Sequence, residues 1–513
     1  MFLTVFTVSC CGVILSWILE TLCLVPKSTV VWRRQRAVNL VHISNWLLCF
    51  TLVLAITQRP WFSLAIICCA QLFMLLVNQA KYHSLREPFL AQDFEYFSDA
   101  IKHPRLYIPF FGVWRIVLAV TAISIAIATG LTFEASLLDS LSTVSFALHI
   151  ALLLLGSSAV LFLAVKQLPV ASLNPERDQH KFGQMAFLYS YFAMLFKPVV
   201  IDAALGVKKS AVDKKLADSL PHIVAVQSES FFDPRLCYPM VNPAVLSNFD
   251  QICTQALQFG SIKVPAWGAN TVRTEAAFLT GLTPEQLGIH QFNPYRLFAK
   301  QPVLSLAKVL QQAGYKTLCI HPYPVSFYLR DQVFPALGFD QFIDITSFSA
   351  TDKQGQYTSD QAVAKKVDDI LQQATQPLFI FVISMENHGP LHLEKTNNAE
   401  LDKIFSAQGV SKYNASAAEL ADLNTYLRHL RNADTMVAQL TTSLKQQSRA
   451  GLLAWYGDHI PIMPKVYAAL GEPSPDTPYF IWHSQQSPAN SQQQEQAVHN
   501  LAGKILHYIG LPD

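Results

Sequence analysis

Five long apolar stretches fill the first 165 residues, and each is long enough to cross a lipid bilayer as a helix. A hydrocarbon core about 30 Å thick needs about 20 apolar residues at 1.5 Å per residue. The stretches are 2–25, 37–57, 61–80, 116–133 and 141–165. The first lacks a basic start and a small-residue cleavage site, so we interpret it as a retained span rather than a signal peptide. We therefore expect residues 1–165 to form a transmembrane helical domain of five spans.

Beyond residue 165 the chain becomes more polar and its pattern changes. Only 17 of the chain's 74 charged residues lie in the first 165 positions. From about residue 215, short apolar runs alternate with segments of helical periodicity. The expected strands are 223–227, 317–320, 378–384, 452–456 and 479–482, and the expected helices include 303–313, 360–373, 421–445 and 493–509. This alternation favours a mainly parallel sheet covered by helices on both faces, so we predict an α/β domain over 215–513.

The segment 166–214, expected to be a linker, decides which side of the membrane the α/β domain occupies. The loop after the first apolar stretch carries only basic charges, and the positive-inside rule places it in the cytoplasm. These charges are Lys27, Arg33, Arg34 and Arg36. Five spans would leave the α/β domain in the cytoplasm as well. The stretch 182–201 is either a sixth span, which would move that domain outside, or an amphipathic helix at the membrane surface.

Composition argues against several functions. The net charge of +2 gives no electrostatic reason to expect a nucleic acid partner. The nine cysteines show neither a disulfide framework nor the spacing of a zinc ribbon. The sequence contains no Walker A loop and no dinucleotide fingerprint, so no nucleotide is expected. A transporter would carry charged groups along its spans, and we expect these spans to bury almost none.

Polar residues with ligand chemistry follow three of the expected strands. Glu229 follows 223–227, His388 follows 378–384, and Asp458-His459 follows 452–456. In open α/β sheets, ligands bind beyond the carboxyl ends of the strands. Each residue alone is more simply explained as a helix cap, an ion-pair partner or a polar loop residue. Two carboxylates and an imidazole at successive strand ends instead suit a divalent ion such as Mn²⁺ or Zn²⁺.

Thr271 lies in the segment GANTVRTEAAFLTG, where small residues precede a helix-forming run. We expect it at a helix N-terminus, where free N–H groups and the helix dipole favour an anion. The simpler interpretation makes Thr271 an N-cap only, with Thr274 as the competing choice. The functional interpretation makes Thr271 a nucleophile. A free threonine hydroxyl attacks poorly near neutral pH, so a metal or an adjacent base must then lower its pKa.

Together these motifs resemble the sulfatase-like branch of the alkaline phosphatase superfamily, in particular the lipoteichoic acid synthase and phosphoglycerol transferase group. The resemblance covers most of residues 222–483. It includes Glu229-Ser230-Phe231, Asn270-Thr271, Thr274-Glu275, the block from His321 to Arg330, Asn387-His388 and Tyr456-Gly457-Asp458-His459. It implies an alkaline-phosphatase-like or sulfatase-like α/β domain behind an N-terminal transmembrane bundle.

The resemblance also implies a role for each matching side chain. Glu229, Thr271, Asp458 and His459 would bind one divalent metal ion, with Mn²⁺ as the first choice and Zn²⁺ or Mg²⁺ as alternatives. Thr271 would also be the catalytic nucleophile. The substrate-binding residues, which would contact the phosphate and the leaving group, are His321, Arg330 and His388. The Arg330 fork can hold two phosphate oxygens at once.

The implied reaction moves a phosphoglycerol-type head group from a membrane phospholipid to an envelope glycan or polyol-phosphate (teichoic-type) acceptor, through a phosphothreonine. Tyr323 stands where the synthases have an acidic residue near the glycerol, and Tyr328 where they have a tryptophan. A phosphoethanolamine transferase is therefore the alternative within the transferases, and a phosphodiesterase or other hydrolase would pass the group to water. A sulfatase needs a cysteine or serine that is converted to formylglycine, which Thr271 cannot supply.

The resemblance further implies a multi-pass protein of the plasma (inner) membrane with its catalytic domain on the outer or periplasmic face. This placement agrees with the charge rule only if 182–201 crosses the bilayer.

Overall fold

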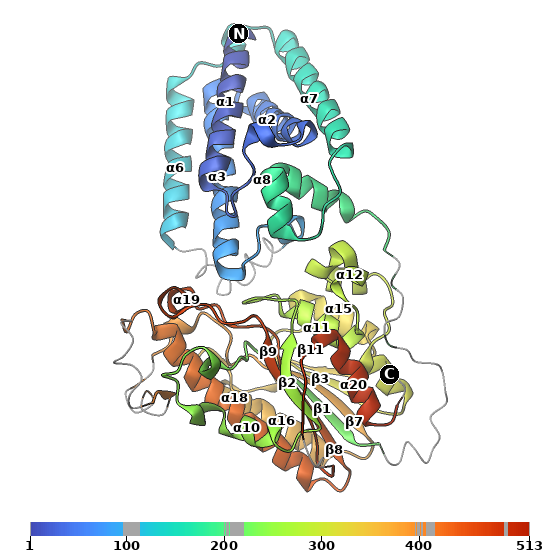
Figure 1. Ribbon diagram of the computed structural model, residues 1–513. Helices are drawn as coiled ribbons and strands as arrows, with labels where there is room; N and C mark the ends of the chain where they lie inside the picture. Colours follow the sequence, from blue (N-terminus) through green and yellow to red (C-terminus); the bar gives the residue numbers. More distant parts are fainter. Residues whose placement is uncertain are drawn as a thin grey trace. The chain divides into compact units, whose positions relative to one another are not determined.

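The computed structural model describes residues 2–95, 113–199, 201, 205, 220–395, 397, 401, 404–406, 416–486 and 491–511. The chain divides into two compact units, Met1–Pro198 and Val199–Asp513 (Figure 1).

The N-terminal unit is helical. Its long helices are α1 (Phe2–Cys23), α2 (Arg36–Thr57), α3 (Pro60–Leu85), α6 (Val113–Phe133), α7 (Thr143–Lys166) and α8 (Pro175–Met194). Among the described residues, α1, α2, α3 and α7 are long and apolar enough to cross a membrane. α2 packs against α7 and α3, and α1 packs against α3. The remaining expected span, 116–133, is helical within α6, and the number of spans stays a prediction.

A buried ion pair ties α8 to the start of the chain. α8 occupies the expected linker and bends at Gly183, where φ is +67°. The next N–H, of Gln184, donates to Glu20 Oε1 at 2.9 Å. Arg34 Nη1 and His42 Nδ1 lie 3.3 and 3.2 Å from Glu20 Oε2. Glu20 lies in α1 and is 1% exposed, and it is the one buried Asp, Glu, Lys or Arg among the described residues of α1, α2, α3 and α7, in agreement with the expectation that the spans bury almost no charge.

The C-terminal unit is built on a nine-stranded, mainly parallel sheet, as expected. Its strands are β1 (His222–Ser228), β2 (Gln258–Lys263), β3 (Lys316–Ile320), β4 (Gln341–Ile343), β7 (Leu378–Ile383), β8 (Gly451–Gly457), β9 (Thr477–His483), β10 (Gln492–Gln493) and β11 (Gln496–Ala497). The order is β10-β2-β9-β8-β1-β7-β3-β4, with β11 also on β2. Only β9 runs antiparallel to its neighbours. β5 (Lys353–Gln354) and β6 (Tyr357–Thr358) form a separate antiparallel hairpin.

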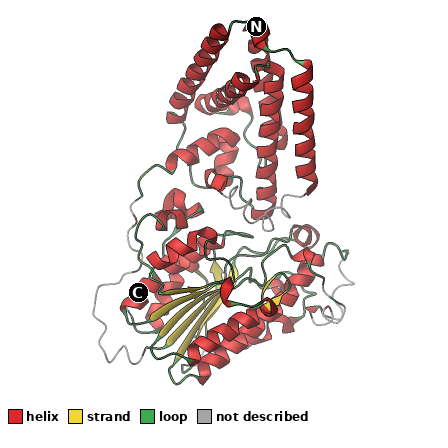
Figure 2. Cartoon of the chain, turned by 180° about the vertical axis from the view of Figure 1, so that it is seen from behind, coloured by secondary structure: helices red, strands yellow, loops and turns green. Residues whose placement is uncertain are grey.

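Helices cover both faces of the sheet (Figure 2). On one face lie α10 (Ser247–Cys253), α16 (Asp360–Gln372), α18 (Ala421–Gln446) and α19 (Pro464–Leu470). On the other lie α11 (Thr271–Thr280), α12 (Pro284–Leu287), α13 (Tyr295–Phe298), α14 (Leu306–Gln312), α15 (Arg330–Ala336) and α20 (Leu501–Tyr508). Alternate strand residues enter the two cores: Val224 and Val226 face one, and Ile223 and Ala225 the other. This two-sided burial explains why the central strands are apolar throughout.

The five expected strands and the helices 360–373 and 421–445 are confirmed to within two residues. The expected helix 303–313 is shorter, as α14. The expected helix 493–509 is wrong in its first half. Residues Gln492–Gln493 and Gln496–Ala497 pair with β2 at the sheet edge, and the helix begins only at Leu501.

Candidate active site

The carboxyl ends of neighbouring parallel strands deliver the expected site residues to one edge of the sheet. Glu229 follows β1, Asp458-His459 follows β8, and His321 follows β3. β1 pairs with β8 on one side and with β7 on the other, and β7 pairs with β3. Residues far apart in the sequence thus become neighbours because their strands end together.

The four expected metal ligands lie together. Ligand atoms of Glu229, Asp458 and His459 all lie within 4.8 Å of one another. His459 Nε2 is 3.7 Å from Glu229 Oε1 and 3.3 Å from Asp458 Oδ2. Thr271 Oγ1 is 3.5 Å from the same His459 Nε2. All four side chains are at most 9% exposed, so three oxygen-donor side chains and one nitrogen-donor side chain converge away from solvent.

This donor set fits a divalent cation. His459 Nδ1 lies 3.0 Å from the Ile460 carbonyl oxygen, which can only accept, so the lone pair of the neutral imidazole is on Nε2. Asp458 Oδ2 is buried and has no hydrogen-bond partner among the described residues. Burial raises the pKa of Glu229, as does the nearby Asp458 carboxylate, and burial also raises the pKa of Asp458. A bound cation would remove this penalty and keep both carboxylates ionised.

Thr271 is the first residue of α11, as expected for a helix N-terminus. Asn270 occupies the N-cap position with φ of +67°, and it makes no side-chain cap hydrogen bond. The interpretation of Thr271 as the N-cap is therefore wrong. Thr274, the competing choice, donates its hydroxyl to the Asp458 carbonyl oxygen at 2.8 Å instead. The Thr271 hydroxyl thus lies at the positive end of the helix dipole and beside the cluster of acids.

Ser230 joins two of the candidate ligands. Its backbone N–H donates to Asp458 Oδ1 at 2.8 Å, and its hydroxyl donates to Glu229 Oε1 at 2.8 Å. Ser230 has φ of +53°, an unfavourable conformation for a serine. Tyr426 holds this backbone through a 2.9 Å hydrogen bond to the Ser230 carbonyl oxygen. The sequence contained Ser230 in a motif but gave no sign of this role.

A family model described as Sulfatase matches residues 221–511, more than half of the chain. The chain belongs to the sulfatase family. The matched region contains every expected site residue and confirms the resemblance drawn from the motifs.

Two relatives and one solved structure add to this comparison. Capsular polysaccharide biosynthesis protein RkpI of Rhizobium meliloti is 26% identical over 93% of this chain and 88% of its own length. Lipoteichoic acid synthase 1 of Bacillus subtilis is 26% identical over 30% of this chain and 23% of its own length. The integral membrane protein lipooligosaccharide phosphoethanolamine transferase A (EptA) of Neisseria meningitidis has a TM-score of 0.52 at 13% identity, covering 93% of this chain and 96% of that one. This last likeness shows a shared fold.

Within the sulfatase domain, Arg330 is buried in an ion pair with Glu275 of α11. Its Nε lies 3.2 Å from Glu275 Oε2, and its Nη2 contacts Oε1. Burial opposes the charge on Arg330, but the Glu275 carboxylate raises the Arg330 pKa above its ordinary value. The two preceding residues, Tyr328 and Leu329, both have φ of +59°, which is strained for non-glycine residues. Arg330 uses at least part of its fork to join α15 to α11, and its expected phosphate contact stays a prediction.

His321 is fully engaged with protein groups. Its Nδ1 lies 3.0 Å from the Ile383 carbonyl oxygen, and its Nε2 lies 3.2 Å from Arg330 Nη1. A carbonyl accepts and a guanidinium donates, so His321 is neutral with its proton on Nδ1. Burial and Arg330 lower the His321 pKa well below its ordinary value. Its expected contact with phosphate also stays a prediction.

His388 is near the candidate metal ligands but is held by residues that the sequence did not indicate. Its Nδ1 lies 2.8 Å from the Gly389 carbonyl oxygen and 3.2 Å from Tyr357 Oη. Burial lowers the His388 pKa, and the Gly389 carbonyl and the charge of Asp458 raise it in part. Tyr357 lies in a two-residue strand without a strong pattern, so no sequence signal marked it.

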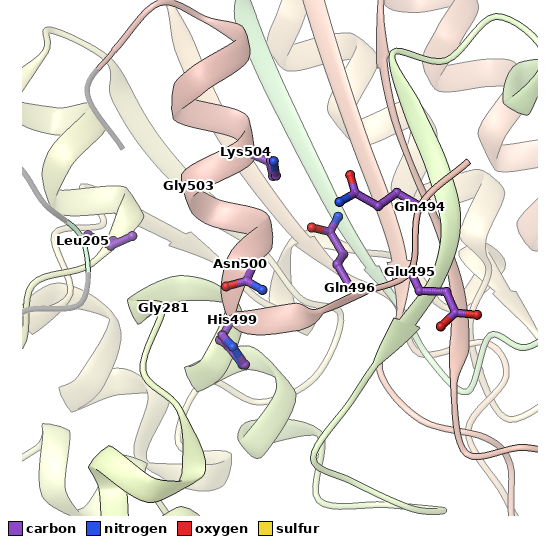
Figure 3. A pocket seen from close by; sticks show the side chains of 9 residues that line it. All are labelled: Leu205, Gly281, Gln494, Glu495, Gln496, His499, Asn500, Gly503 and Lys504. Carbon is purple, nitrogen blue, oxygen red and sulfur yellow. The ribbon is translucent and has the colours of Figure 1, made fainter. Parts of the chain in front are cut away.

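A cavity of about 650 Å³ lies beside the sheet edge where β10 and β11 pair with β2 (Figure 3). Its described lining residues are Leu205, Gly281, Gln494, Glu495, Gln496, His499, Asn500, Gly503 and Lys504. No expected site residue is among them. Gly281 is the C-cap of α11, at the opposite end of that helix from Thr271. The cavity is therefore separate from the candidate active site.

Proposed function

We propose that this chain is a membrane-anchored phospho-group transferase that moves a phosphoglycerol-type head group from a membrane phospholipid to an envelope glycan or teichoic-type acceptor. The position of Thr271 carries the proposal: its hydroxyl lies at the N-terminus of α11 and 3.5 Å from His459 Nε2. The membrane-length helices support a lipid donor, and the similarity to a capsular polysaccharide biosynthesis protein and to a lipoteichoic acid synthase supports a polymeric acceptor.

Five of the candidate side chains have a defined task in this reaction. Glu229, Asp458, His459 and Thr271 would hold a divalent cation, Mn²⁺ in first place, whose charge lowers the pKa of the Thr271 hydroxyl and offsets charge on the phosphoryl oxygens. The N-terminus of α11 favours the anionic phosphate next to Thr271. Thr271 then displaces diacylglycerol and forms a phosphothreonine diester. His388 would protonate the departing oxygen, a task that suits an imidazole.

A phosphoethanolamine donor is the second candidate, favoured by the aromatic residues beside His321. The rings of Tyr323 and Phe327 lie 5.1 Å apart, and those of Phe327 and Tyr328 lie 4.1 Å apart. Aromatic faces attract a cation such as the ammonium of ethanolamine. Tyr323 offers no carboxylate to a glycerol hydroxyl. The fold shared with EptA is compatible with either donor.

The donor and the acceptor can be tested together. Purified full-length protein is incubated with vesicles of phosphatidylglycerol or phosphatidylethanolamine, with and without a glycan acceptor, and diacylglycerol release is measured. We expect release from phosphatidylglycerol that depends on the acceptor, and a loss of roughly a thousandfold or more in Thr271→Ala. Acceptor-independent release with a free phosphate ester would instead indicate a hydrolase.

Thr280→Ala is the matched control. Thr280 lies at the other end of α11, and its hydroxyl donates to the Ala276 carbonyl oxygen and accepts from the Leu282 N–H, neither of which is an expected site residue. This variant should retain release. Full activity in Thr271→Ala would contradict the proposal.

A further inference from the structure

The loop after β7 fixes the protonation pattern of His388. The Gly389 carbonyl oxygen, 2.8 Å from His388 Nδ1, can only accept a hydrogen bond. Nδ1 of the neutral ring therefore carries the proton, and Nε2 carries the lone pair. Of the two nitrogens, Nε2 is the one that can exchange a proton with a substrate oxygen.

Tyr357 completes this arrangement from β6. Its Oη lies 3.2 Å from His388 Nδ1 and 3.2 Å from the Gly389 carbonyl oxygen. A phenol can accept from Nδ1–H while it donates to the carbonyl, so one proton on Nδ1 satisfies all three groups. The two rings also pack edge to face, with centroids 5.3 Å apart. Burial raises the pKa of Tyr357, so the phenol keeps the proton that it donates.

The β5–β6 hairpin that carries Tyr357 is docked on the same loop. Gln356 Nε2 donates to the Pro390 carbonyl oxygen at 3.0 Å, and the Gln356 N–H donates to Glu394 Oε1 at 3.1 Å. The turn requires glycine at Gly355, because an added Cβ would lie 2.2 Å from Glu394 Oε1. These contacts hold the hairpin against the His388 loop.

His429 of α18 fixes both ends of this loop. Its Nδ1 lies 2.7 Å from Glu386 Oε1, two residues before His388, and its Nε2 lies 3.1 Å from Glu394 Oε2. Glu386 also accepts the first N–H of α16, from Asp360, at 2.7 Å. The loop and the hairpin thus form one rigid support around His388.

We propose that Tyr357 is a positioning residue that holds His388 as the Nδ1–H tautomer and so reserves Nε2 for proton exchange with the leaving and entering oxygens. The inference rests on the proposed role of His388 in group transfer. In the first step the bond from Thr271 Oγ1 to phosphorus forms and the bond from phosphorus to the lipid oxygen breaks. The ring enters this step protonated on both nitrogens. The lipid oxygen takes the Nε2 proton, which leaves the neutral Nδ1–H tautomer, and the Thr271 proton goes to solvent.

In the second step Nε2 takes the proton of the acceptor hydroxyl as the bond from that oxygen to phosphorus forms. The bond from Thr271 to phosphorus breaks, and Thr271 regains a proton from solvent. His388 thus returns to its starting state with Nδ1–H unchanged throughout. The ring must not flip or change tautomer between the two steps, which is what Tyr357 and Gly389 ensure.

Leaving-group chemistry separates positioning from a purely structural role. A nitrophenolate leaves without a proton, whereas the alkoxide of diacylglycerol needs one. We compare wild type, Tyr357→Phe and Tyr315→Phe on a phospholipid and on the p-nitrophenyl phosphodiester of the same head group. Tyr315 is the control because its hydroxyl is buried without a partner among the described residues. Melting temperatures check that each variant folds.

With the phospholipid, kcat of Tyr357→Phe should fall by about tenfold, the effect of one hydrogen bond, while KM is unchanged. The release of nitrophenolate should change less than about twofold on the same grounds. His388→Ala should lose more activity on the phospholipid than Tyr357→Phe, again with a smaller effect on nitrophenolate release. Adding Tyr357→Phe to His388→Ala should cause no further loss. Tyr315→Phe should behave as wild type.

An equal loss on both donors, or no loss on the phospholipid, would overturn the positioning role. An additive double variant would overturn it as well, because Tyr357 would then act independently of His388. Failure of the proposed function has a different signature: wild type itself would then leave Thr271 unmodified with either donor.

Discussion

Ser230 organises the candidate metal ligands although it is not itself an expected ligand. Its hydroxyl fixes Glu229 and its N–H fixes Asp458. Removing an outer hydrogen bond of this kind typically weakens metal binding by 10–100-fold. Ser230→Ala should therefore bind Mn²⁺ and Zn²⁺ about tenfold more weakly than wild type. Calorimetric titration of the metal-stripped, full-length protein measures this difference.

Ser228→Ala provides the comparison for that titration. The Ser228 hydroxyl is buried two residues away and has no hydrogen-bond partner among the described residues. Its removal should leave the affinity unchanged. Equal affinities in Ser230→Ala and wild type would show that Glu229 does not need Ser230 in order to bind a metal.

His429 should make stability depend on pH. Burial lowers the pKa of His429, but hydrogen bonds and charge from Glu386 and Glu394 outweigh burial and raise it to about 9 from 6.5. A group whose pKa is higher in the folded state stabilises the protein fully at pH values below its unfolded-state pKa. This stabilisation is lost as the pH rises through its folded-state pKa. The free energy of unfolding should fall on the order of 3 kcal/mol between about pH 6.5 and 9.5. Denaturant unfolding of the full-length protein in detergent measures it.

His429→Gln isolates this contribution from other groups that titrate in the same range. The variant keeps a hydrogen-bonding side chain but has no charge to lose. Its free energy of unfolding should fall less steeply over that range than that of wild type. Identical slopes would mean that His429 is not charged in the folded protein.

At the scale of elements, the bend in α8 depends on a glycine. An alanine at Gly183 would place its Cβ 2.3 Å from Glu20 Oε1 and 2.6 Å from Arg34 Nη1, at a φ of +67°. Gly183→Ala should therefore destabilise the N-terminal unit by roughly 2 kcal/mol, through strain and through displacement of the ion pair. Thermal melting of the full-length protein in detergent tests this. In Gly156→Ala, on α7, the added Cβ meets nothing within 4 Å in the described chain, so its stability should be unchanged or slightly higher.

The sequence predicted elements that bury both faces and missed those at the sheet edges. β1, β7 and β8 are continuous apolar runs because helices cover both sides. β2, with the sequence QFGSIK, is half exposed and contains a glycine, so it carries no such run. Residues 493–496 are polar, and the segment joins β2 through backbone pairing and one side-chain hydrogen bond from Gln258 to Gln494. Backbone pairing at an edge leaves little trace in side-chain pattern.

The same physical distinction applies to the candidate site. Glu229, Asp458 and His459 were recognisable because they directly follow apolar strands. Tyr357 bonds to His388 and Gly389, and the Ser230 N–H bonds to Asp458. These partners are distant in the sequence, so neither residue leaves a local pattern. Such contacts depend on tertiary structure and require coordinates to be seen.

At the scale of the whole molecule, the N-terminal helices raise the question of which side of the membrane the sulfatase domain occupies. The proposed reaction places the sulfatase domain on the outer face, where glycan acceptors lie. We therefore expect activity from a fusion, after Asp513, of a reporter enzyme that works only outside the cytoplasm. A fusion active only in the cytoplasm would contradict the outer placement and support the orientation given by the basic loop after α1.

The central claim is that Thr271 is the nucleophile of a covalent group transfer. Incubation of the full-length protein with phosphatidylglycerol in the absence of acceptor, followed by mass spectrometry of the peptide that contains Thr271, tests this claim most directly. We expect a glycerophosphate adduct on Thr271 that disappears when acceptor is added. An unmodified Thr271 in a preparation that still transfers the head group would contradict it.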